Sequence, residues 1–442
     1  MAVKKLLIWQ TMIEKIKNFF RSPDKKVVLK NFFSLSILQG LNYVLPLVTY
    51  PYLARTLGAD GIGMIFFAAA FINYFQVLTE YSFNMSATKE IALNTDDKDK
   101  VHEIFNDVLS TKVFLLFISL LIMLPIVLFI PYFGENKWVY ILTFGNVIGF
   151  CIFPSWFFQG IQKMKYITYI NFFSKILFTG AIFVFVKSKE DILLVPLLNA
   201  CGYITAGIIS LFYVGFYLKV PIKRQPFAKI KEQIKVGKYF FLSEFKITLF
   251  TNTNVLLLGF LAGEAAVGYF ASAEKLVRAI GSLYAPFNLA LFPYMSKEMD
   301  KDAVSAYKAV IRIVKNGSLL FVIFLIPIFI FSEETVTIIY GQKMFNSVLV
   351  FKILLFIPIG TFLENMFGKQ ILLNIYKDKL YFRVFLIATL CNIGLNLYLT
   401  SHFSYIGTAI ALVATQIIIN GGLFYYAQRE IQRMSGFGQV KV

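Results

Sequence analysis

Three charged side chains interrupt an otherwise apolar stretch, VGYFASAEKLVRAIGSLYAPF, at residues 267–287. On an α-helix each residue turns by about 100°, so Arg278 lies about 40° and Lys275 about 100° from Glu274. The three charges therefore share one helix face, and the opposite face is apolar. Desolvated lysine and arginine gain most by binding phosphate or carboxylate. This pattern predicts an anion-binding face.

Two other interpretations of the same residues stay open. Glu274 and Arg278 are spaced i, i+4 and can neutralise each other as a buried structural pair. A glutamate inside a membrane helix can also bind and release a coupling ion. Glu274 and Glu244 are the first candidates for that role, and the other glutamates within predicted spans, Glu80 and Glu364, complete the candidate set.

Further polar residues in apolar runs suggest a hydrated central cavity. Lys175 and Lys352 add deep cations, although Lys175 can also pair with a glutamate on another helix. Polar stripes recur on several predicted helices and supply candidate contacts for a sugar: Gln39, Asn42, Asn73, Thr248 and Asn252. Asparagine and threonine in membrane helices also commonly hydrogen-bond to neighbouring helices, which is the alternative interpretation.

The composition shows what kind of helices must position these side chains. The chain has 442 residues, of which 58% are hydrophobic and only 15% charged, with a mean hydropathy of +0.68. A soluble domain carries about a quarter charged residues. Apolar runs of about 20 residues, the length that crosses a bilayer as a helix, recur along the chain. We therefore expect an all-α, polytopic membrane protein.

The distribution of basic residues predicts the topology. A net charge of +18 in a soluble protein would suggest nucleic acid, but here the concentration of Lys and Arg in cytoplasmic loops explains it. With twelve spans and both termini in the cytoplasm, the predicted outer loops hold few of the 43 basic residues: Arg55, Lys137, Lys187, Lys189 and Lys343. We predict no nucleic-acid partner.

An internal repeat divides the predicted spans into two halves. LGADGIGMIFFAAA and LAGEAAVGYFASAEK align with Gly58 on Gly263 and Gly63 on Gly268, six predicted helices apart. Parallel repeats imply two pseudo-symmetric six-helix lobes around a central cavity. The expected domains are an amphipathic or loosely structured basic segment (1–27), an N-lobe (28–218), a basic crossover helix (219–238), a C-lobe (239–427) and a cytoplasmic tail (428–442).

Several chemistries lack their signature in the sequence. There is no Walker motif, so direct coupling to ATP is not expected. The two histidines, His102 and His402, fall in predicted loops on opposite sides of the membrane, and the three cysteines lie in apolar runs without metal-ligand spacing. We expect no cofactor, no metal site and no enzymatic activity.

Three segments resemble one family of transporters. YPYLARTLGADGIG, TNTNVLLLGFLAGE and VGYFASAEKLVRAIGSLYAPFNLALFPYMSKE are similar to the Wzx-type polysaccharide repeat-unit flippases. These flippases belong to the MOP exporter superfamily, which also contains the MATE drug exporters. The resemblance extends over essentially the whole chain and implies a MATE-like fold.

The resemblance implies a function for the predicted cavity. Proteins of this family move an undecaprenyl-diphosphate-linked oligosaccharide across the bacterial inner membrane by alternating access, driven by a proton or sodium gradient. The first candidates for binding the head group are Arg278 and Lys275, and the second are Lys175 and Lys352. Membrane lipids, a polymerase and a chain-length regulator are the expected partners. A multidrug/cation antiporter of the same fold and a membrane polymerase are the alternatives; the first would favour an acidic cavity and the second a large outer loop.

Overall fold

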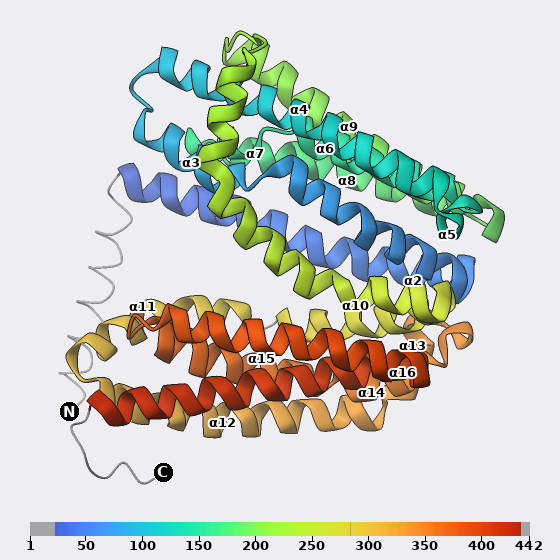
Figure 1. Ribbon diagram of the computed structural model, residues 1–442, viewed down its shortest axis with the longest axis vertical. Helices are drawn as coiled ribbons and strands as arrows, with labels where there is room; N and C mark the ends of the chain where they lie inside the picture. Colours follow the sequence, from blue (N-terminus) through green and yellow to red (C-terminus); the bar gives the residue numbers. More distant parts are fainter. Residues whose placement is uncertain (1–22, 283, 435–442) are drawn as a thin grey trace, which may run out of the picture. The chain divides into compact units, whose positions relative to one another are not determined.

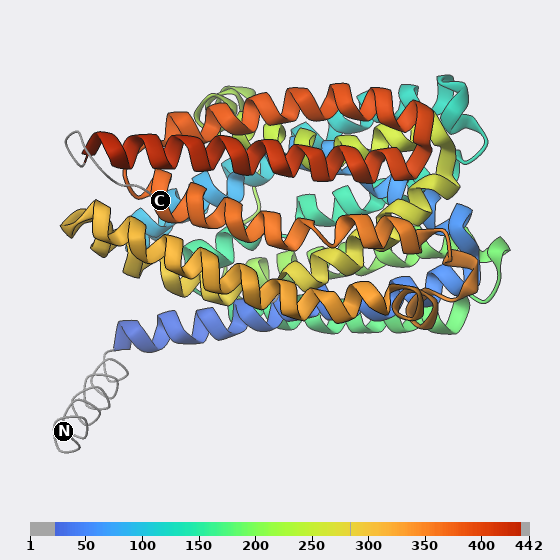
Figure 2. The ribbon, with the colours of Figure 1, turned by 90° about the horizontal axis from the view of Figure 1, so that it is seen from below.

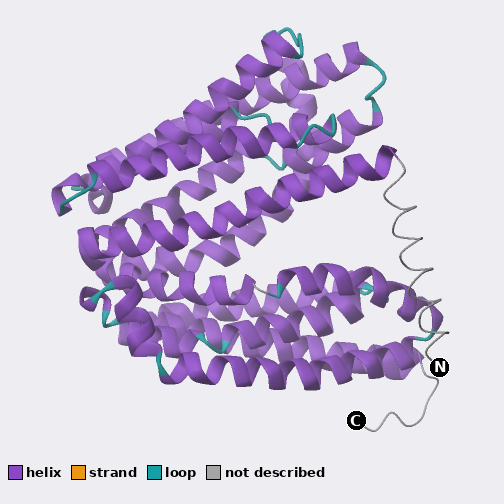
Figure 3. Cartoon of the chain, turned by 180° about the vertical axis from the view of Figure 1, so that it is seen from behind, coloured by secondary structure: helices purple, strands orange, loops and turns teal. Residues whose placement is uncertain are grey.

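The computed structural model describes residues 23–282 and 284–434, and these residues form helices joined by short connections, without a strand (Figures 1 and 3). The predicted all-α class is confirmed. Most of the predicted N-terminal segment 1–27 and the end of the predicted tail lie outside the described residues.

The helices follow one another with little intervening chain. The first half of the chain comprises α2 (Pro23–Glu80), α3 (Phe83–Leu93), α4 (Lys98–Phe129), α5 (Pro131–Gly134), α6 (Lys137–Ile152), α7 (Ser155–Gly160), α8 (Lys165–Phe185), η1 (Lys189–Leu193), α9 (Leu194–Phe212) and η2 (Tyr213–Tyr217). The second half comprises α10 (Phe227–Ser282), α11 (Ala285–Lys301), α12 (Ala303–Ile330), α13 (Ser332–Tyr340), η3 (Gln342–Met344), α14 (Ser347–Leu354), α15 (Ile357–Glu364), η4 (Asn365–Leu373) and α16 (Asp378–Met434).

Three of the longest helices are interrupted by one non-helical residue each. These residues are Gly58 in α2 (φ 77°), Gly263 in α10 (φ 82°) and Ser404 in α16 (φ 51°). Glycine adopts positive φ without steric cost, so the first two breaks fall where the sequence permits them. The two arms of α16, one before and one after Ser404, lie side by side (Figure 2).

The lengths and composition of the helices fit a membrane. Within the described residues nine helical segments are long and apolar enough to cross a bilayer. Three of the nine contain the breaks at Gly58, Gly263 and Ser404, so the number of segments is not the number of crossings. The chain is an integral membrane protein, and twelve crossings stay a prediction.

The chain forms two compact units. Unit 1 contains the chain up to Pro46, Ile72–Val186 and Leu193–Ile247; unit 2 contains Leu47–Phe71, Lys187–Ile192 and the chain from Thr248 onward. The part of α2 from Leu47 to Phe71, on both sides of Gly58, therefore groups with the C-terminal helices. The predicted crossover (219–238) is helical only from Phe227 onward, and this helical part is the beginning of α10.

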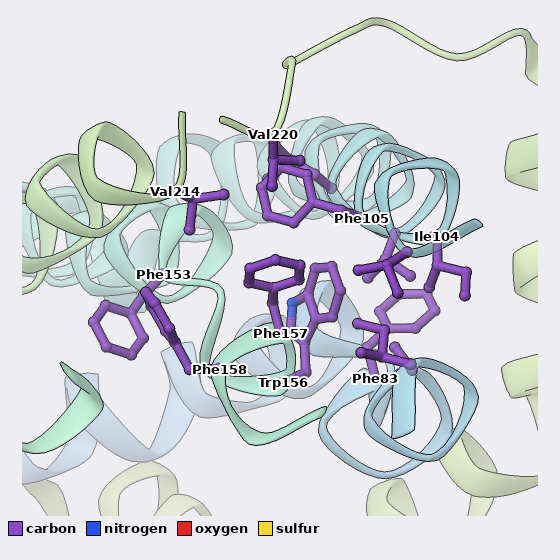
Figure 4. Packing of buried hydrophobic residues seen from close by; sticks show 14 of the residues in the cluster. Phe83, Ile104, Phe105, Phe153, Trp156, Phe157, Phe158, Val214 and Val220 are labelled. Atoms are coloured by element: carbon purple, nitrogen blue, oxygen red, sulfur yellow. The ribbon is translucent and has the colours of Figure 1, made fainter. Parts of the chain in front are cut away.

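Each unit has its own apolar core. In unit 1 the rings of Phe105, Trp156 and Phe157 meet, with the centroid of Phe105 5.7 Å from that of Trp156 and 4.9 Å from that of Phe157 (Figure 4). This packing fixes the short helix α7 against α3 and α4. In unit 2, Met366, Ile371 and Leu423 lie in a buried cluster that joins η4 to α16.

Candidate functional site

The charged residues of α10 form an ion pair. Arg278 donates from Nε and Nη2 to Oε1 of Glu274, over 3.0 and 2.7 Å. The Glu274 side chain is 12% exposed, whereas that of Arg278 is 54% exposed. The carboxylate is therefore covered, whereas about half of the arginine side chain is open to a ligand. The structural pairing considered from the sequence is present, and it leaves Glu274 neutralised.

Lys275 has a different environment from its neighbours. Its Nζ lies 6.0 Å from the ring centroid of Tyr50 and 5.8 Å from that of Phe66, and these two rings meet edge to face at 4.9 Å. Aromatic faces attract a cation without neutralising its charge. Within residues 23–282 and 284–434 no carboxylate forms an ion pair with Lys275. The geometry holds a positive charge beside Arg278 that can accept an anion.

The other two predicted cations lie against aromatic rings elsewhere. Lys352 of α14 has its Nζ 5.9 Å from the Phe329 ring in unit 2, and Lys175 of α8 has its Nζ 5.5 Å from the Tyr203 ring in unit 1. Their assignment to one head-group site stays a prediction.

The predicted sugar contacts are spread over both units. Asn73 is partly buried in unit 1, and Thr248 is buried in unit 2. Nδ2 of Asn252 is buried without a hydrogen-bond partner, so this side chain retains an unused donor. Gln39 and Asn42 lie in α2, but their side chains fall outside the described part of the structure.

A buried ionic cluster in unit 1 includes a residue that the sequence analysis missed. Lys112 is 1% exposed; its Nζ donates to the Phe150 carbonyl at 2.8 Å and lies 3.8 Å from Oε1 of Glu80. Asn84 donates to the other oxygen of Glu80 at 3.5 Å. The sequence analysis does not single out Lys112, because both of its partners lie on other helices. Glu244, another predicted coupling residue, is exposed on α10 between Phe227 and the break at Gly263.

Removal of the Lys112 charge is expected to destabilise unit 1. Lys112→Met leaves Glu80 without its cation and the Phe150 carbonyl without its donor. A hydrogen bond to a charged group contributes about 1.5–3 kcal/mol, so the melting temperature in detergent should fall. Lys137→Met, at an exposed position, is the control. Equal melting temperatures for the two variants would contradict this role for Lys112.

A second polar network, in unit 2, was also missed. Asn396 donates to Asn254 at 2.6 Å and accepts from Thr400 at 2.9 Å, and Thr400 contacts Thr408 at 2.8 Å. All four side chains are buried. The i, i+4 spacing of Asn396 and Thr400 was a usable signal. The network ties α10 to both arms of α16, close to the break at Ser404.

Each of the two aligned glycines, Gly63 and Gly268, packs closely against the backbone of the other repeat. A Cβ built on Gly63 would lie 1.8 Å from the carbonyl oxygen of Glu264, and one built on Gly268 would lie 2.1 Å from that of Ala59. In the sequence repeat Ala59 aligns with Glu264 and Gly63 with Gly268. The two contacts are therefore equivalent and reciprocal, as a local two-fold relation between the repeats requires.

The remaining predicted coupling residue, Glu364, ends α15. Its Oε2 accepts a hydrogen bond of 3.2 Å from Nε2 of Gln416. Within the described residues, no group of three or more His, Cys, Asp or Glu side chains is arranged to hold a metal ion.

Comparison with solved structures defines the fold. The chain superposes on an inward-facing multidrug resistance MATE transporter of the MOP superfamily with a TM-score of 0.66 at 13% identity, over 92% of this chain and 100% of that one. It superposes on the lipid II flippase MurJ in an inward closed conformation with a TM-score of 0.68 at 14% identity, over 93% of each chain. These likenesses confirm the MATE/MOP-like helical fold.

Sequence comparison gives the family. Residues 28–299 match the family described as "Polysaccharide biosynthesis protein", and the chain belongs to this family. It is 31% identical to a "Putative O-antigen transporter" of Escherichia coli (strain K12), over 92% of this chain and 98% of the relative. It is 25% identical to a protein of the same description from Shigella dysenteriae, over 88% of this chain and 97% of the relative. The family resemblance expected from the sequence is confirmed.

Proposed function

We propose that this protein is a flippase for a lipid-linked oligosaccharide used in surface polysaccharide assembly. It moves an oligosaccharide attached through a diphosphate to undecaprenyl from the cytoplasmic to the periplasmic leaflet of the inner membrane. The transport uses alternating access and an ion gradient, with both termini in the cytoplasm. Family membership and the description of two relatives as O-antigen transporters support the polysaccharide substrate.

The observation that carries the proposal is the environment of Lys275 and Arg278. Lys275 lies over two aromatic rings without an ion-pair partner in the described part of the chain, and the half-exposed Arg278 covers Glu274. A diphosphate has oxygens for both cations, and arginine and lysine bind phosphate through charge-assisted hydrogen bonds. An antiporter of organic cations would need an accessible carboxylate here, but Glu274 is already paired.

Ligand binding to the purified protein tests the proposal. Undecaprenyl diphosphate should raise the melting temperature of the wild type in detergent, because a ligand that binds only the folded state stabilises it. Undecaprenol, which has the same tail without the diphosphate, is the matched control and should have little effect. Stabilisation by both lipids alike would contradict recognition of the diphosphate. Stabilisation by an organic cation alone would favour the antiporter.

A further inference from the structure

Glu364 occupies an unusual place in the helical framework. It is the last residue of α15, and the chain continues from it as the π-helical segment η4. π-Helical turns inside longer helices are rare and frequently lie at functional sites. The whole stretch Ser347–Leu373 is apolar enough to span a membrane, so Glu364 places a carboxyl group inside a spanning segment.

The partner of this carboxyl group is positioned by a glycine. A Cβ on Gly360, one turn before Glu364, would lie 2.3 Å from Cγ of Gln416 and 3.2 Å from Nδ2 of Asn420. The absence of a side chain at Gly360 therefore lets α16 approach closely. Gln416 then reaches Oε2 of Glu364 with its amide at 3.2 Å. The contact depends on this close approach.

The half-buried Glu364 has a neutral hydrogen-bond partner, in contrast to three glutamates that lie near basic side chains. Glu80 lies near Lys112, Glu274 binds Arg278, and Glu430 binds both Lys377 and Arg433. Within the part of the chain that the structure describes, Glu364 forms no ion pair. The charged and titratable groups that act on it electrostatically are Lys369 on η4, Tyr284 before α11 and Tyr381 on α16.

Two buried hydrogen-bond acceptors, on the segments that carry Glu364 and its partner Gln416, have no donor within the described residues. Oδ1 of Asn365, the next residue, and Oδ1 of Asn420, one turn after Gln416, are both buried without a partner. The Asn365 side chain is 3% exposed, and its Nδ2 is already bound to the Tyr284 hydroxyl and the Thr361 carbonyl. Buried acceptors normally find a donor. A carboxylate supplies none, whereas a protonated carboxyl group supplies an O–H.

From this geometry we propose that Glu364, which accepts a hydrogen bond from Gln416 and forms no ion pair within the described residues, is the proton-carrying group of the transporter. One carboxylate oxygen takes up one proton, and the side chain changes from an anion to a neutral hydrogen-bond donor. The Gln416 amide donates to the other oxygen in both states. This inference rests on the proposed function, because it names the ion that drives transport.

Infrared difference spectroscopy of the purified full-length protein tests the site without requiring transport. On stepping from high to low pH, the wild type should gain a protonated-carboxyl C=O band that Glu364→Gln lacks. Gly360→Ala should shift this band, because the added methyl displaces Gln416; Gly421→Ala, which meets nothing within 4 Å, is the control. An unchanged band in Glu364→Gln would overturn the assignment.

A transport assay then separates the inference from the function on which it rests. In proteoliposomes, a pH gradient should stimulate wild-type flipping of a lipid-linked oligosaccharide, and Glu364→Gln should lose that stimulation. Stimulation by a sodium gradient alone, or a full response to pH in the variant, would overturn the proton role. If the wild type moves no lipid-linked glycan, the proposed function fails, and the infrared band still decides whether Glu364 titrates.

Discussion

Lys275→Ala is expected to weaken binding of a diphosphate-linked lipid by about 10- to 100-fold. The Lys275 ammonium is held over Tyr50 and Phe66 and has no ion-pair partner in the described residues, so its charge is available to the ligand. A hydrogen bond to a charged group contributes about 1.5–3 kcal/mol, and each 1.4 kcal/mol is about tenfold in affinity. Titration of undecaprenyl diphosphate into the purified variant measures the loss.

Two further variants show whether the charge or only the packing is responsible. Lys275→Arg keeps a cation over the rings and should retain most of the binding. Lys308→Ala removes an exposed lysine from α12 and should bind like the wild type. If Lys275→Ala binds the diphosphate lipid as tightly as the Lys308→Ala control, the head group does not bind Lys275.

Substitution of Gly63 or Gly268 is expected to cause the largest loss of folded protein. A single methyl group at Gly63 would overlap the Glu264 carbonyl oxygen, and one at Gly268 would overlap that of Ala59. Backbone atoms cannot move aside as a flexible side chain can, so the segments around the two breaks must separate. Overpacking of this kind costs about 1–3 kcal/mol or more, and valine should cost more than alanine.

Because the two contacts are equivalent, the two substitutions can be compared directly. Gly63→Ala and Gly268→Ala should lower the melting temperature by similar amounts, because each disturbs one of two equivalent contacts. Gly281→Ala, on the same arm of α10 as Gly268, meets nothing within 4 Å and is the control. Melting of both variants at the temperature of Gly281→Ala would show that the close approach of the two segments is absent.

The features that could be predicted were those that follow from residue spacing and composition along the chain. The i, i+4 separation of Glu274 and Arg278 made their pairing one of the interpretations, and the structure contains this pair. The aligned glycines marked two segments that are in contact. The helical class followed from the apolar runs, because their length and composition suit a bilayer.

Contacts between distant helices could not be predicted in the same way. Asn254 and Asn396 are brought together by the packing of α10 on α16, and no periodicity identifies such a partner. The rings that face the Lys275 ammonium belong to Tyr50 and Phe66 of α2, more than two hundred positions away in the chain. Lys112 was overlooked because Glu80 and the Phe150 carbonyl, which hold it in the interior, belong to other helices.

Flipping of a lipid-linked oligosaccharide by the purified protein tests the central claim most directly. The protein is reconstituted into vesicles with a fluorescent oligosaccharide attached to undecaprenyl diphosphate, and the fraction accessible to a membrane-impermeant quencher is followed in time. The account predicts that the wild type equilibrates the lipid between leaflets far faster than protein-free vesicles, and that Lys275→Ala is much slower. Equilibration at the protein-free rate in wild-type vesicles would contradict it.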